Sequence, residues 1–320
     1  MTSQQIEYFL TLAKLRSFSK TAQKLFITQP SLSQYIQNME SQLGVKLFDR
    51  SVNPIRLTKA GEICLHTCET IKSAEENMTN QLADITELKT GSLKIGATFF
   101  YASQMLSKSV SEFCRKHEGI SVSIIEDNSK NLLEMVKTGE LDLYVGAGSF
   151  DTKNLDVEEL STERMYLAVP QSLETPNLSE DKLLTVDDIR KSTMKMLTAS
   201  MNPLDLKLVK ELPFLTTTSM EDKLFEICRD FGFKPKIALS VRTSETLFSF
   251  VNQGLGVSLI PDTIAKFGNF LDHPKYYPLE HPLGTTKICL VSRKNSYLSK
   301  AALEYPLMLK ELVDIGTWRV

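Results

Sequence analysis

A run of thirty residues, 59–88, contains no proline and a single glycine, Gly61, near its start. As a continuous α-helix this run would be roughly 45 Å long. Apolar residues recur every seven positions in it, which is the spacing of a helix that pairs with another along one seam. The residues predicted to form this dimerisation seam are Ile71, Met78, Leu82 and Ile85. Two interpretations stay open: a pairing helix, or a helix buried against the part of the chain that follows it.

Two short helical patterns precede the long run, in "FSKTAQKLFITQPSLSQYIQNMESQLG", residues 18–44. Ser19 is placed to cap the first pattern and Thr28 the second, and Pro30 is tolerated in a first helical turn. The second pattern buries Leu32 and Ile36 on one side and leaves a polar, almost uncharged side outside. Two short helices joined by a tight turn indicate a helix-turn-helix.

The next residues, "VKLFDRSVNPIRLT" (45–58), alternate apolar and polar side chains on both sides of Asn53-Pro54. This pattern predicts a small hairpin, or wing. Residues 1–60 carry eight Lys or Arg and three Asp or Glu, a net charge of +5, whereas the rest of the chain carries −7. A basic head on an acidic body favours a polyanion as the partner of the head. A solvated, lysine-rich helical surface is the alternative, and charge alone does not decide between them.

The length of 320 residues suggests two or three domains. No stretch of eighteen apolar residues is present, and the N-terminus lacks the features of a secretory signal, so we expect a cytoplasmic protein without a membrane span. The five cysteines are scattered, which predicts reduced thiols rather than a disulfide framework. Cys64 and Cys68 lie one helical turn apart, and small buried hydrophobes are favoured there over a redox pair.

From about residue 91 the pattern changes to alternating strands and helices. "LKIGATF", "GISVSIIED" and "LDLYVGAG" are predicted strands separated by helical patterns, an order that indicates a parallel sheet. A second set of strands and helices follows, including "MKMLTAS" (194–200), "PFLTTTS", "PKIALSV" and "GVSLIP", and the chain ends in a predicted helix across residues 299–313. The fold class is therefore α/β overall.

Catalytic and metal-binding patterns are absent from the sequence. The four histidines are dispersed, without a nucleophile partner or metal-ligand spacing, and no P-loop, GxGxxG, GxSxG or HExxH occurs. We therefore expect no enzyme activity, no cofactor and no metal.

The stretch from Phe18 to Glu62 resembles the N-terminal region of LysR-type transcriptional regulators. The pieces that carry the resemblance are Ala22, the run Gln29-Pro30-Ser31-Leu32-Ser33, Leu43-Gly44-Val45, Leu47-Phe48-Asp49-Arg50 and Leu57-Thr58-Lys59-Ala60-Gly61. The rest of the chain is similar more loosely, through "KIGAT", "GELDLYVG", "YLAVP", "LPFL" and "GLGVSLIP".

The resemblance implies a winged helix-turn-helix, a linker helix used for dimerisation and a two-subdomain effector-binding module similar to the periplasmic-binding-protein fold. The domain boundaries expected on this basis are 1–58 for the DNA-binding domain, 59–89 for the linker helix, 90–163 with 270–320 for subdomain I, and 164–269 for subdomain II. The partners implied are double-stranded promoter DNA, a small-molecule effector, further copies of the chain as a dimer or tetramer, and RNA polymerase as an additional candidate.

A recognition helix reads base edges in the major groove with residues near its N-terminus. The predicted DNA-binding residues are Ser19, Lys20, Lys24, Thr28, Gln29, Pro30, Ser31, Ser33, Gln34, Gln37, Arg50, Arg56 and Lys59. Many family members carry Arg where this chain has Gln34 and Gln37, and the wing has Asn53 where Arg or Lys is common. An Arg–guanine contact is therefore missing, which predicts a target site rich in A and T.

The effector is expected where strand ends meet helix N-termini. The predicted effector-binding residues are Thr98, Phe100, Asn128, Ser129, Gly146, Ala147, Thr216, Thr217 and Thr218. Phe100 stands where the family often has a hydroxyl, which suggests an effector with an apolar or aromatic part. An ordinary capping or turn role stays open for each of these residues.

Two other classes of protein remain as alternatives. A solute-binding protein would use the two-lobed module alone, but the missing signal peptide and the basic head oppose it. A metabolic enzyme on an α/β scaffold is opposed by the absence of a catalytic constellation. The sequence therefore favours a DNA-binding regulator controlled by a small molecule.

Overall fold

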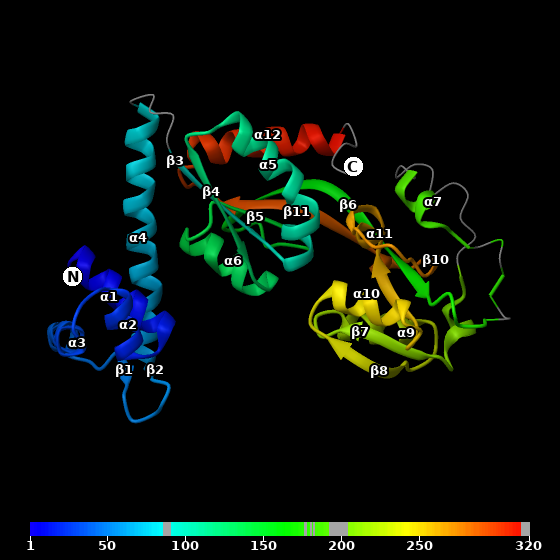
Figure 1. The fold of residues 1–320 in the computed structure, drawn as a ribbon, viewed down its shortest axis with the longest axis horizontal. Helices are drawn as coiled ribbons and strands as arrows, with labels where there is room; N and C mark the ends of the chain where they lie inside the picture. Colours follow the sequence, from blue (N-terminus) through cyan, green and yellow to red (C-terminus); the bar gives the residue numbers. More distant parts are fainter. Residues whose placement is uncertain (86–90, 176–177, 180, 182, 192–203, 315–320) are drawn as a thin grey trace.

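The structure is a computed structural model of the chain and describes residues 1–85, 91–175, 178–179, 181, 183–191 and 204–314. In Figure 1 the N-terminal helices (blue) gather around one end of a long helix (cyan). The remaining residues form sheets and helices on the other side of that helix. The prediction of a helical N-terminal part, a long helix and an α/β part is confirmed. We call these three parts the head, the linker helix and the module.

The head consists of α1 (Ser3–Leu15), α2 (Phe18–Lys24) and α3 (Gln29–Leu43). Its core is made by apolar side chains spaced at helical intervals, chiefly Ile6, Phe9 and Leu12 of α1 and Leu32, Ile36 and Met39 of α3. Four residues separate α2 from α3. The predicted helix-turn-helix is therefore confirmed, and one side of α3 is fixed by the core, so its other side faces outward.

Each head helix begins at a hydroxyl side chain that accepts a hydrogen bond from a backbone N–H of the first turn. Thr2, Ser17 and Thr28 fill these positions. The predicted cap at Thr28 is confirmed. The prediction that Ser19 caps the second helix is wrong, because the backbone is extended at Ser17 (φ −153°, ψ 118°) and Ser19 already lies inside the helix.

The predicted wing is also present. Its strands are β1 (Phe48–Asp49) and β2 (Arg56–Leu57), and the linker helix that follows is α4 (Lys59–Ile85). The two strands pair antiparallel. Gly61, in the first turn of α4, packs so closely that a Cβ there would lie 2.1 Å from the Leu47 carbonyl oxygen. A glycine is required at this point because α4 and the wing approach each other directly.

The first half of the module is built on three parallel strands, as predicted. They are β3 (Gly91–Ala97), β4 (Ile120–Glu126) and β5 (Leu143–Ala147). The central strand is β3, which pairs with β4 on one side and β5 on the other. The connecting helices are η1 (Tyr101–Met105), α5 (Leu106–Lys116) and α6 (Ser129–Thr138). The carboxyl ends of the three strands therefore meet at one edge.

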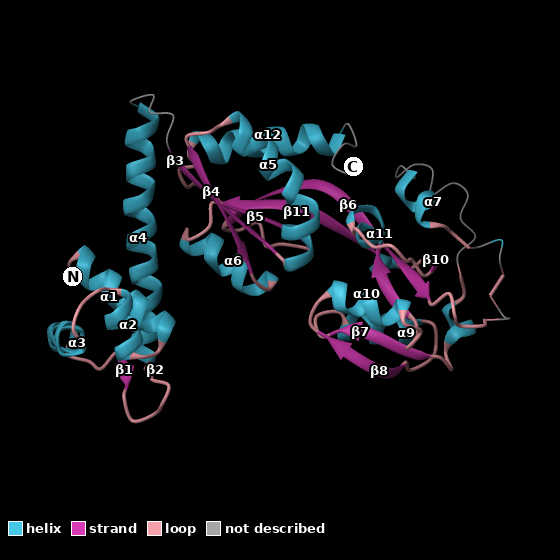
Figure 2. Cartoon of the chain, in the orientation of Figure 1, coloured by secondary structure: helices cyan, strands magenta, loops and turns pink. Residues whose placement is uncertain are grey.

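Two long antiparallel strands join this half to the other (Figure 2). They are β6 (Leu155–Val169) and β11 (Thr285–Arg293), and β9 (Ser258–Pro261) and β10 (Lys275–Pro278) pair with the later part of β6. The strand order is β10-β6-β11-β5-β3-β4, with β9 beside β6. The subdomain boundaries predicted at residues 163 and 269 remain predictions. Strand β10, which the prediction assigns to subdomain I, pairs with residues 166–169 of β6, which it assigns to subdomain II.

The second half contains a parallel pair of strands with helices around it. The strands are β7 (Pro213–Thr217) and β8 (Lys236–Val241), and the helices are α7 (Val186–Lys191), η3 (Leu206–Val209), α9 (Glu221–Asp230), α10 (Ser244–Asn252) and α11 (Asp262–Phe267). The short η4 (Pro282–Gly284) precedes β11, and α12 (Lys300–Asp314) follows it. The strand predicted at 194–200 lies outside the described residues.

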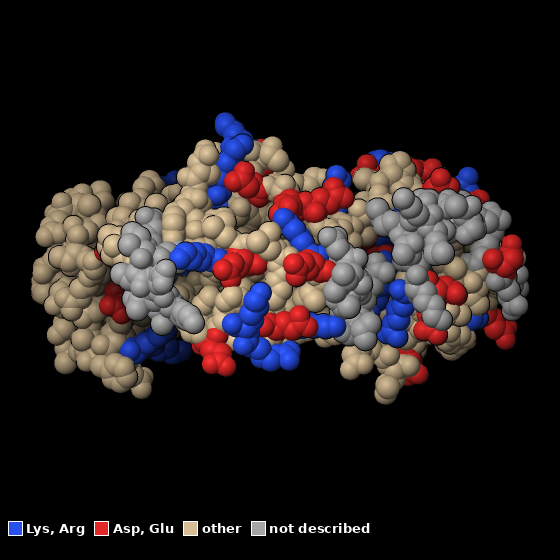
Figure 3. Space-filling view, turned by 90° about the horizontal axis from the view of Figure 1, so that it is seen from above, with Lys and Arg blue, Asp and Glu red and all other residues tan. Residues whose placement is uncertain are grey.

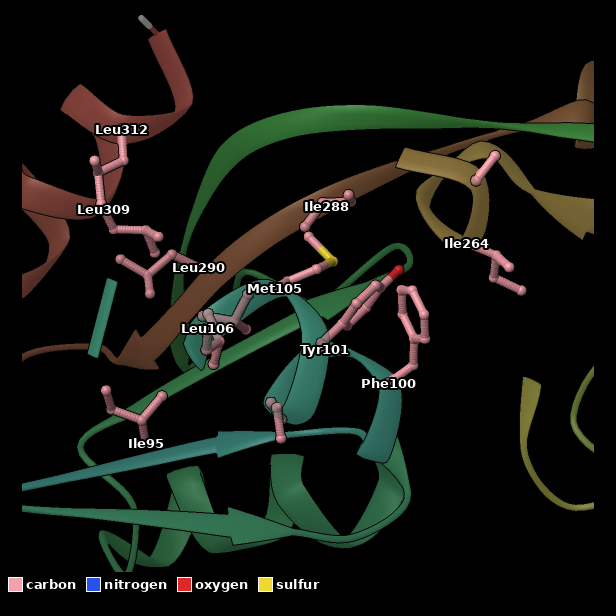
Figure 4. Close-up of a cluster of buried hydrophobic side chains, with 14 of the residues drawn as sticks. Ile95, Phe100, Tyr101, Met105, Leu106, Ile264, Ile288, Leu290, Leu309 and Leu312 are labelled. Atoms are coloured by element: carbon pink, nitrogen blue, oxygen red, sulfur yellow. The ribbon is translucent and has the colours of Figure 1, made fainter. Parts of the chain in front are cut away.

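One buried apolar cluster extends through both halves of the module (Figure 4). It contains Ile95 of β3, Leu290 of β11 and Ile264 of α11. Because these side chains come from strands and helices of both halves, the halves are packed against each other near the crossover strands.

Candidate nucleic-acid interface and ligand site

The outer face of α3 is uncharged from its first residue to Met39. Its exposed side chains are Gln29, Pro30, Ser31, Gln34, Gln37 and Asn38, and Ser33 is half-buried. Figure 3 shows the end of the molecule that holds α3 (left) with little Lys, Arg, Asp or Glu on the visible face. Amide and hydroxyl groups can both donate and accept hydrogen bonds, which is what the edges of base pairs require.

Two of these side chains are oriented by neighbours in the head. The Ser19 hydroxyl donates to Oε1 of Gln29 at 3.0 Å, which leaves the amide N–H groups of Gln29 directed away from Ser19. The amide of Gln34 donates to Oδ1 of Asn38 at 2.8 Å, one turn further along α3. Ser19 therefore contributes to the predicted interface by orienting Gln29.

A buried carboxylate, which sequence analysis missed, joins the recognition helix to the wing. Glu40 is the last buried side chain of α3, and its Oε1 accepts the backbone N–H groups of Leu47 at 2.9 Å and Phe48 at 3.3 Å. Its Oε2 lies 3.2 Å from Lys46 Nζ and 3.3 Å from Arg50. Burial by itself would raise the pKa of Glu40, but these N–H groups and cations outweigh it and hold the pKa below its usual value.

Arg50, predicted to contact phosphate, is also part of this junction. Its guanidinium reaches Glu40, lies 3.5 Å from the Ser33 hydroxyl and sits over the Phe18 ring at 5.0 Å. Three contacts, two from α3 and one from α2, fix the position of this cation beside α3. A guanidinium held in this way needs little reordering to meet a phosphate.

The other predicted phosphate contacts are exposed cations with different surroundings. Lys20 lies on α2 beside Ser19, and Arg56 lies on the wing. Lys59 is 4.0 Å from Glu62, and both side chains are largely exposed, so this pair contributes little. Lys24 lines a cavity between the head, α4 and the module. The role of each cation at DNA stays a prediction.

Lys20→Gln is expected to weaken binding to any double-stranded DNA and to lower its salt dependence. A lysine that neutralises one phosphate releases about one counterion, so the slope of log affinity against log salt should fall by about 1. Fluorescence anisotropy at several salt concentrations measures this slope. Lys14→Gln, which removes an exposed lysine on α1, serves as the control, and an equal slope for Lys20→Gln and the wild-type chain would contradict the assignment.

The linker helix exposes apolar side chains along its length. Ile71, Met78 and Leu82 are exposed, in agreement with their predicted place in a pairing seam, although the pairing itself stays a prediction. The side chain of Ile85 lies outside the described residues. Cys64 and Cys68 are buried in the head core with their sulfur atoms 3.8 Å apart, so they anchor α4 to the head.

Five of the predicted effector residues lie at one edge of the module sheet. Thr98 follows β3, Asn128 and Ser129 follow β4, and Gly146 and Ala147 end β5. The Asn128 side chain accepts the Asn131 N–H at 3.0 Å, so Asn128 caps the N-terminus of α6. A ligand role for these residues stays a prediction.

The glycine at the end of β5 has a packing reason. A Cβ at Gly146 would lie 2.0 Å from the hydroxyl oxygen of Tyr144, whose ring is fully buried. Substitution there would displace the ring of Tyr144.

The remaining predicted effector residues are less accessible. Thr216 and Thr217 end β7 and are buried, whereas Thr218 is exposed. Phe100 is 7% exposed and belongs to the module core, whereas its neighbour Phe99 is 48% exposed. The exposed aromatic ring beside Thr98 therefore belongs to Phe99, whereas the sequence had suggested Phe100.

A buried carboxyl group connects the two halves of the module. Glu163 of β6 accepts the Tyr101 hydroxyl at 2.8 Å and the Thr263 hydroxyl at 3.2 Å. Tyr101 belongs to η1 of the first half, and its ring extends toward the segment that carries Ile264 (Figure 4). Thr263 belongs to α11 of the second half. Burial raises the pKa of Glu163 to about 7.

Sequence analysis missed the Glu163 cluster because nothing in the local pattern marks it. Lys223, whose charge acts on Glu163, donates to the Thr286 hydroxyl at 3.0 Å. Burial lowers the pKa of Lys223, and the Glu163 charge opposes this shift. Residues from four separate segments meet here, which sequence spacing does not reveal.

Glu163→Gln is expected to remove a pH dependence of stability. The pKa of Glu163 is about 7 in the folded chain and near 4.5 unfolded, so the folded state binds the proton more tightly. The free energy of unfolding should therefore fall as pH rises from 4.5 to 7, by about 3 kcal/mol. Urea unfolding at pH 5.5 and pH 8 should show about 2 kcal/mol of this loss, because Glu163 of the unfolded chain is already largely ionised at pH 5.5.

In Glu163→Gln the free energy of unfolding should not fall in this way between pH 5.5 and pH 8, because the glutamine side chain stays neutral at both values. Glu159→Gln is the matched control, since it removes an exposed carboxylate from the same strand. Equal pH dependence in the wild-type chain and Glu163→Gln would contradict the assignment.

Neither a metal site nor a membrane-spanning helix is present among the residues that the structure describes. No group of three or more His, Cys, Asp or Glu in those ranges is placed to hold a metal ion. Within the same part of the chain, every helix is too short or too polar to cross a membrane.

Two family models match the chain in succession. A model of the bacterial regulatory helix-turn-helix proteins of the lysR family matches residues 3–62. A model of the LysR substrate binding domain matches residues 86–311. The first match covers the head and the start of α4, the second covers the module, and residues 63–85 of α4 lie between the two matches.

Curated relatives match over nearly their full length. The uncharacterized HTH-type transcriptional regulator YcgK of Bacillus subtilis is 27% identical over 314 residues, covering 96% of this chain and 93% of the relative. A probable RuBisCO transcriptional regulator of Trieres chinensis is 26% identical over 303 residues, with coverage of 94% and 93%.

Solved structures show the same fold at lower identity. CbnR, a LysR family transcriptional regulator, matches with a TM-score of 0.65 and 17% identity, over 97% of this chain and 99% of that one. Full-length CbnR in a complex with its target DNA matches with a TM-score of 0.65, 18% identity and the same coverage.

Proposed function

This chain belongs to the LysR family of DNA-binding transcriptional regulators, and we propose that a small molecule held between the two halves of its module controls how it binds promoter DNA. The observation that carries the DNA part is the outer face of α3. That face is exposed and uncharged, and cations lie beside it on α2 and the wing. Base edges are read by donors and acceptors, whereas the phosphates are met by charge.

The side chains proposed to read bases are Gln29 and Gln34, with Ser31 and Ser33 beside them. A glutamine amide can bond to both N6 and N7 of adenine, whereas the guanine edge is best matched by arginine. Since no arginine lies on the exposed part of α3, we propose a target site rich in A and T. The Pro30 ring, exposed at the start of the helix, is placed to pack on a thymine methyl group.

The effector is proposed to lie at the sheet edge formed by Thr98, Asn128, Ser129, Gly146 and Ala147. Helix α6 begins there, and its free N–H groups favour an acceptor on the ligand. The exposed ring of Phe99 supports an effector with an apolar or aromatic part. Glu163, which joins the two halves next to this region, would change its contacts if the halves moved.

The proposed mechanism is a change in the angle between the two halves on effector binding. In an oligomer paired along α4, as dimer or tetramer, such a change alters the spacing of the heads and hence the bend of the DNA. The exposed apolar residues Ile71, Met78 and Leu82 support this pairing. A cytoplasmic location and contact with RNA polymerase belong to the same proposal.

Selection of preferred sites from random double-stranded DNA tests the proposed function. We expect the full-length chain to enrich one sequence motif in which A·T pairs dominate the contacted positions. Enrichment of a guanine-rich half-site that depends on Gln34 would contradict the proposed base preference. Absence of any enriched motif would contradict sequence-specific binding itself.

A further inference from the structure

The linker helix and the module meet at one close contact. The Ser73 hydroxyl of α4 donates to the Gly139 carbonyl oxygen at 2.6 Å, and Ser73 is only 3% exposed. Gly139 ends α6 in a left-handed conformation (φ +81°), and a Cβ there would lie 2.3 Å from the Ser73 hydroxyl oxygen. Only a small residue on each side permits this approach.

The same part of α4 is attached to the head. Cys64 and Cys68 lie in the head core, and the Ser3 hydroxyl of α1 donates to Glu75 of α4 at 2.8 Å. Residues 64–75 of one helix therefore contact both the head and the module. A rigid helix held at both sides transmits the position of one part to the other.

Helix α6 connects this contact to the proposed effector site. Its first residue, Ser129, lies at the sheet edge with Asn128, and its last turn ends at Gly139. Ten helical residues span about 15 Å. Leu132 and Val136 are fully buried against the sheet, so α6 moves with the sheet as one body.

We propose that Ser73 and Gly139 form the joint through which the module positions the DNA-binding head. The proposal rests on the proposed function, since the positioned head is the DNA-binding part. A displacement at the N-terminal end of α6 shifts Gly139, and the hydrogen bond to Ser73 passes this shift to α4 and the head. Ser73 and Gly139 are positioning residues, which act on DNA through the head.

A cavity beside the joint leaves room for such a movement. It has a volume of about 700 Å³ and is lined by residues of the head, α4 and the module. Its apolar lining includes Leu10, Leu65 and Met135. Because these surfaces are not packed tightly against one another, the head can shift about the joint without breaking a continuous core.

The joint also contains a pair of acidic side chains. Glu69 of α4 and Glu140, next to Gly139, both line the adjoining cavity, and burial together with the Glu140 charge raises the pKa of Glu69 to about 7. The cations that line the adjoining cavity are Lys14 and Lys24 of the head, Lys72 of α4 and Lys94 of β3, and the Arg293 guanidinium of β11 lies against Gly139. Protonation of Glu69 below about pH 7 removes the repulsion between the two carboxylates and favours the contact between Ser73 and Gly139. This preference is lost as pH rises through that value.

Ser73→Ala tests the joint with a minimal change, since it removes the hydrogen bond and leaves the helix intact. The measured quantities are the affinity for a selected full site, the affinity for one half of that site, and the bend of the full site. We expect the affinity for the half site to stay unchanged. The ratio of full-site affinity to half-site affinity should change by about tenfold, and the bend angle of the full site should shift. A role in folding alone would lower both affinities together.

Two matched controls separate loss of the Ser73–Gly139 contact from loss of a hydroxyl on α4 and from strain at a left-handed glycine. Thr70→Ala also removes a hydroxyl from α4, but this hydroxyl bonds within the helix to the His66 carbonyl oxygen. Gly232→Ala introduces the same left-handed strain (φ +78°) as Gly139→Ala, but its Cβ would meet its nearest neighbour at 3.6 Å. We expect Gly139→Ala to alter the ratio and the bend, and both controls to leave them unchanged.

Measurement at pH 6 and pH 8 gives a further test. The full-site to half-site ratio of the wild-type chain should differ between these values, and Glu140→Gln, whose side chain stays neutral, should reduce the difference. If Ser73→Ala and Gly139→Ala keep the wild-type ratio and bend, the joint is overturned while the proposed function stands. If the wild-type chain binds neither site, the proposed function is overturned instead.

Discussion

Glu40→Ala is expected to detach the base of the wing from α3 and to weaken DNA binding by at least about tenfold. The substitution leaves the Leu47 and Phe48 N–H groups without their acceptor in a buried position. It also removes the anion that holds Arg50 beside α3. Removal of one partner from a buried, charged hydrogen-bond network costs about 3 kcal/mol.

The loss should be local and measurable in the full-length chain. Hydrogen exchange followed by mass spectrometry reports the protection of residues 45–50, and 3 kcal/mol corresponds to roughly a hundredfold faster exchange there. Glu62→Ala removes an exposed carboxylate from the first turn of α4 and should leave this protection unchanged. Wild-type protection in Glu40→Ala would show that the wing is held by its packing alone.

The Glu40 network also has a defined pH dependence. Because the pKa of Glu40 is lowered in the folded chain, its contribution to stability is present above the unfolded value of 4.5. This contribution is lost as pH falls through the lowered folded value. Glu40→Ala should therefore remove part of the acid sensitivity of the head.

Gln34→Arg is expected to change the preferred base at one position of the site from adenine to guanine. Gln34 is exposed on the second turn of α3, and its amide donates to the neighbouring Asn38 rather than to a buried group. Arginine can therefore replace it without disturbing the core. A bidentate arginine–guanine contact is worth about 1–3 kcal/mol against the wrong base, which is roughly tenfold or more in affinity.

Comparison of selected sites for the two proteins measures this change. Gln42→Arg adds the same charge to the exposed C-terminal end of α3 and should raise affinity for all sequences alike. A guanine preference at one position in Gln34→Arg, and not in Gln42→Arg, is the expected result. Unaltered base preference in Gln34→Arg would mean that residue 34 does not face the base edges.

The head and the parallel sheet were predictable because their signals are local. Helical spacing of apolar residues identified the buried side of α3, and strand–helix alternation identified β3, β4 and β5. The Ser19 cap was mispredicted by two residues, since serines at 17 and 19 both fit the pattern and only the backbone conformation distinguishes them.

The polar clusters were not predictable, because they join segments far apart in the sequence. Glu40 contacts the wing. Glu163 is bonded to Tyr101, which lies 62 positions away in the sequence, and to Thr263, which lies 100 positions away. Ser73 and Gly139 are separated by 66 positions. A glutamate on the apolar side of a helix, as at Glu40 next to Met39 and one turn after Ile36, is the single signal that could have indicated one of them. The antiparallel pairing of the crossover strands β6 and β11 was not predictable for the same reason, since it depends on residues far apart in the sequence.

The central claim is that this chain binds promoter DNA by reading base edges with an uncharged helix and phosphates with the cations beside it. A mobility-shift assay of the full-length chain with DNA from upstream of its own gene tests this most directly, with a scrambled sequence of equal composition as the competitor. We expect tighter binding to the upstream DNA, with affinity for both DNAs falling as salt is raised. Equal affinity for the two sequences, or binding that does not respond to salt, would contradict the claim.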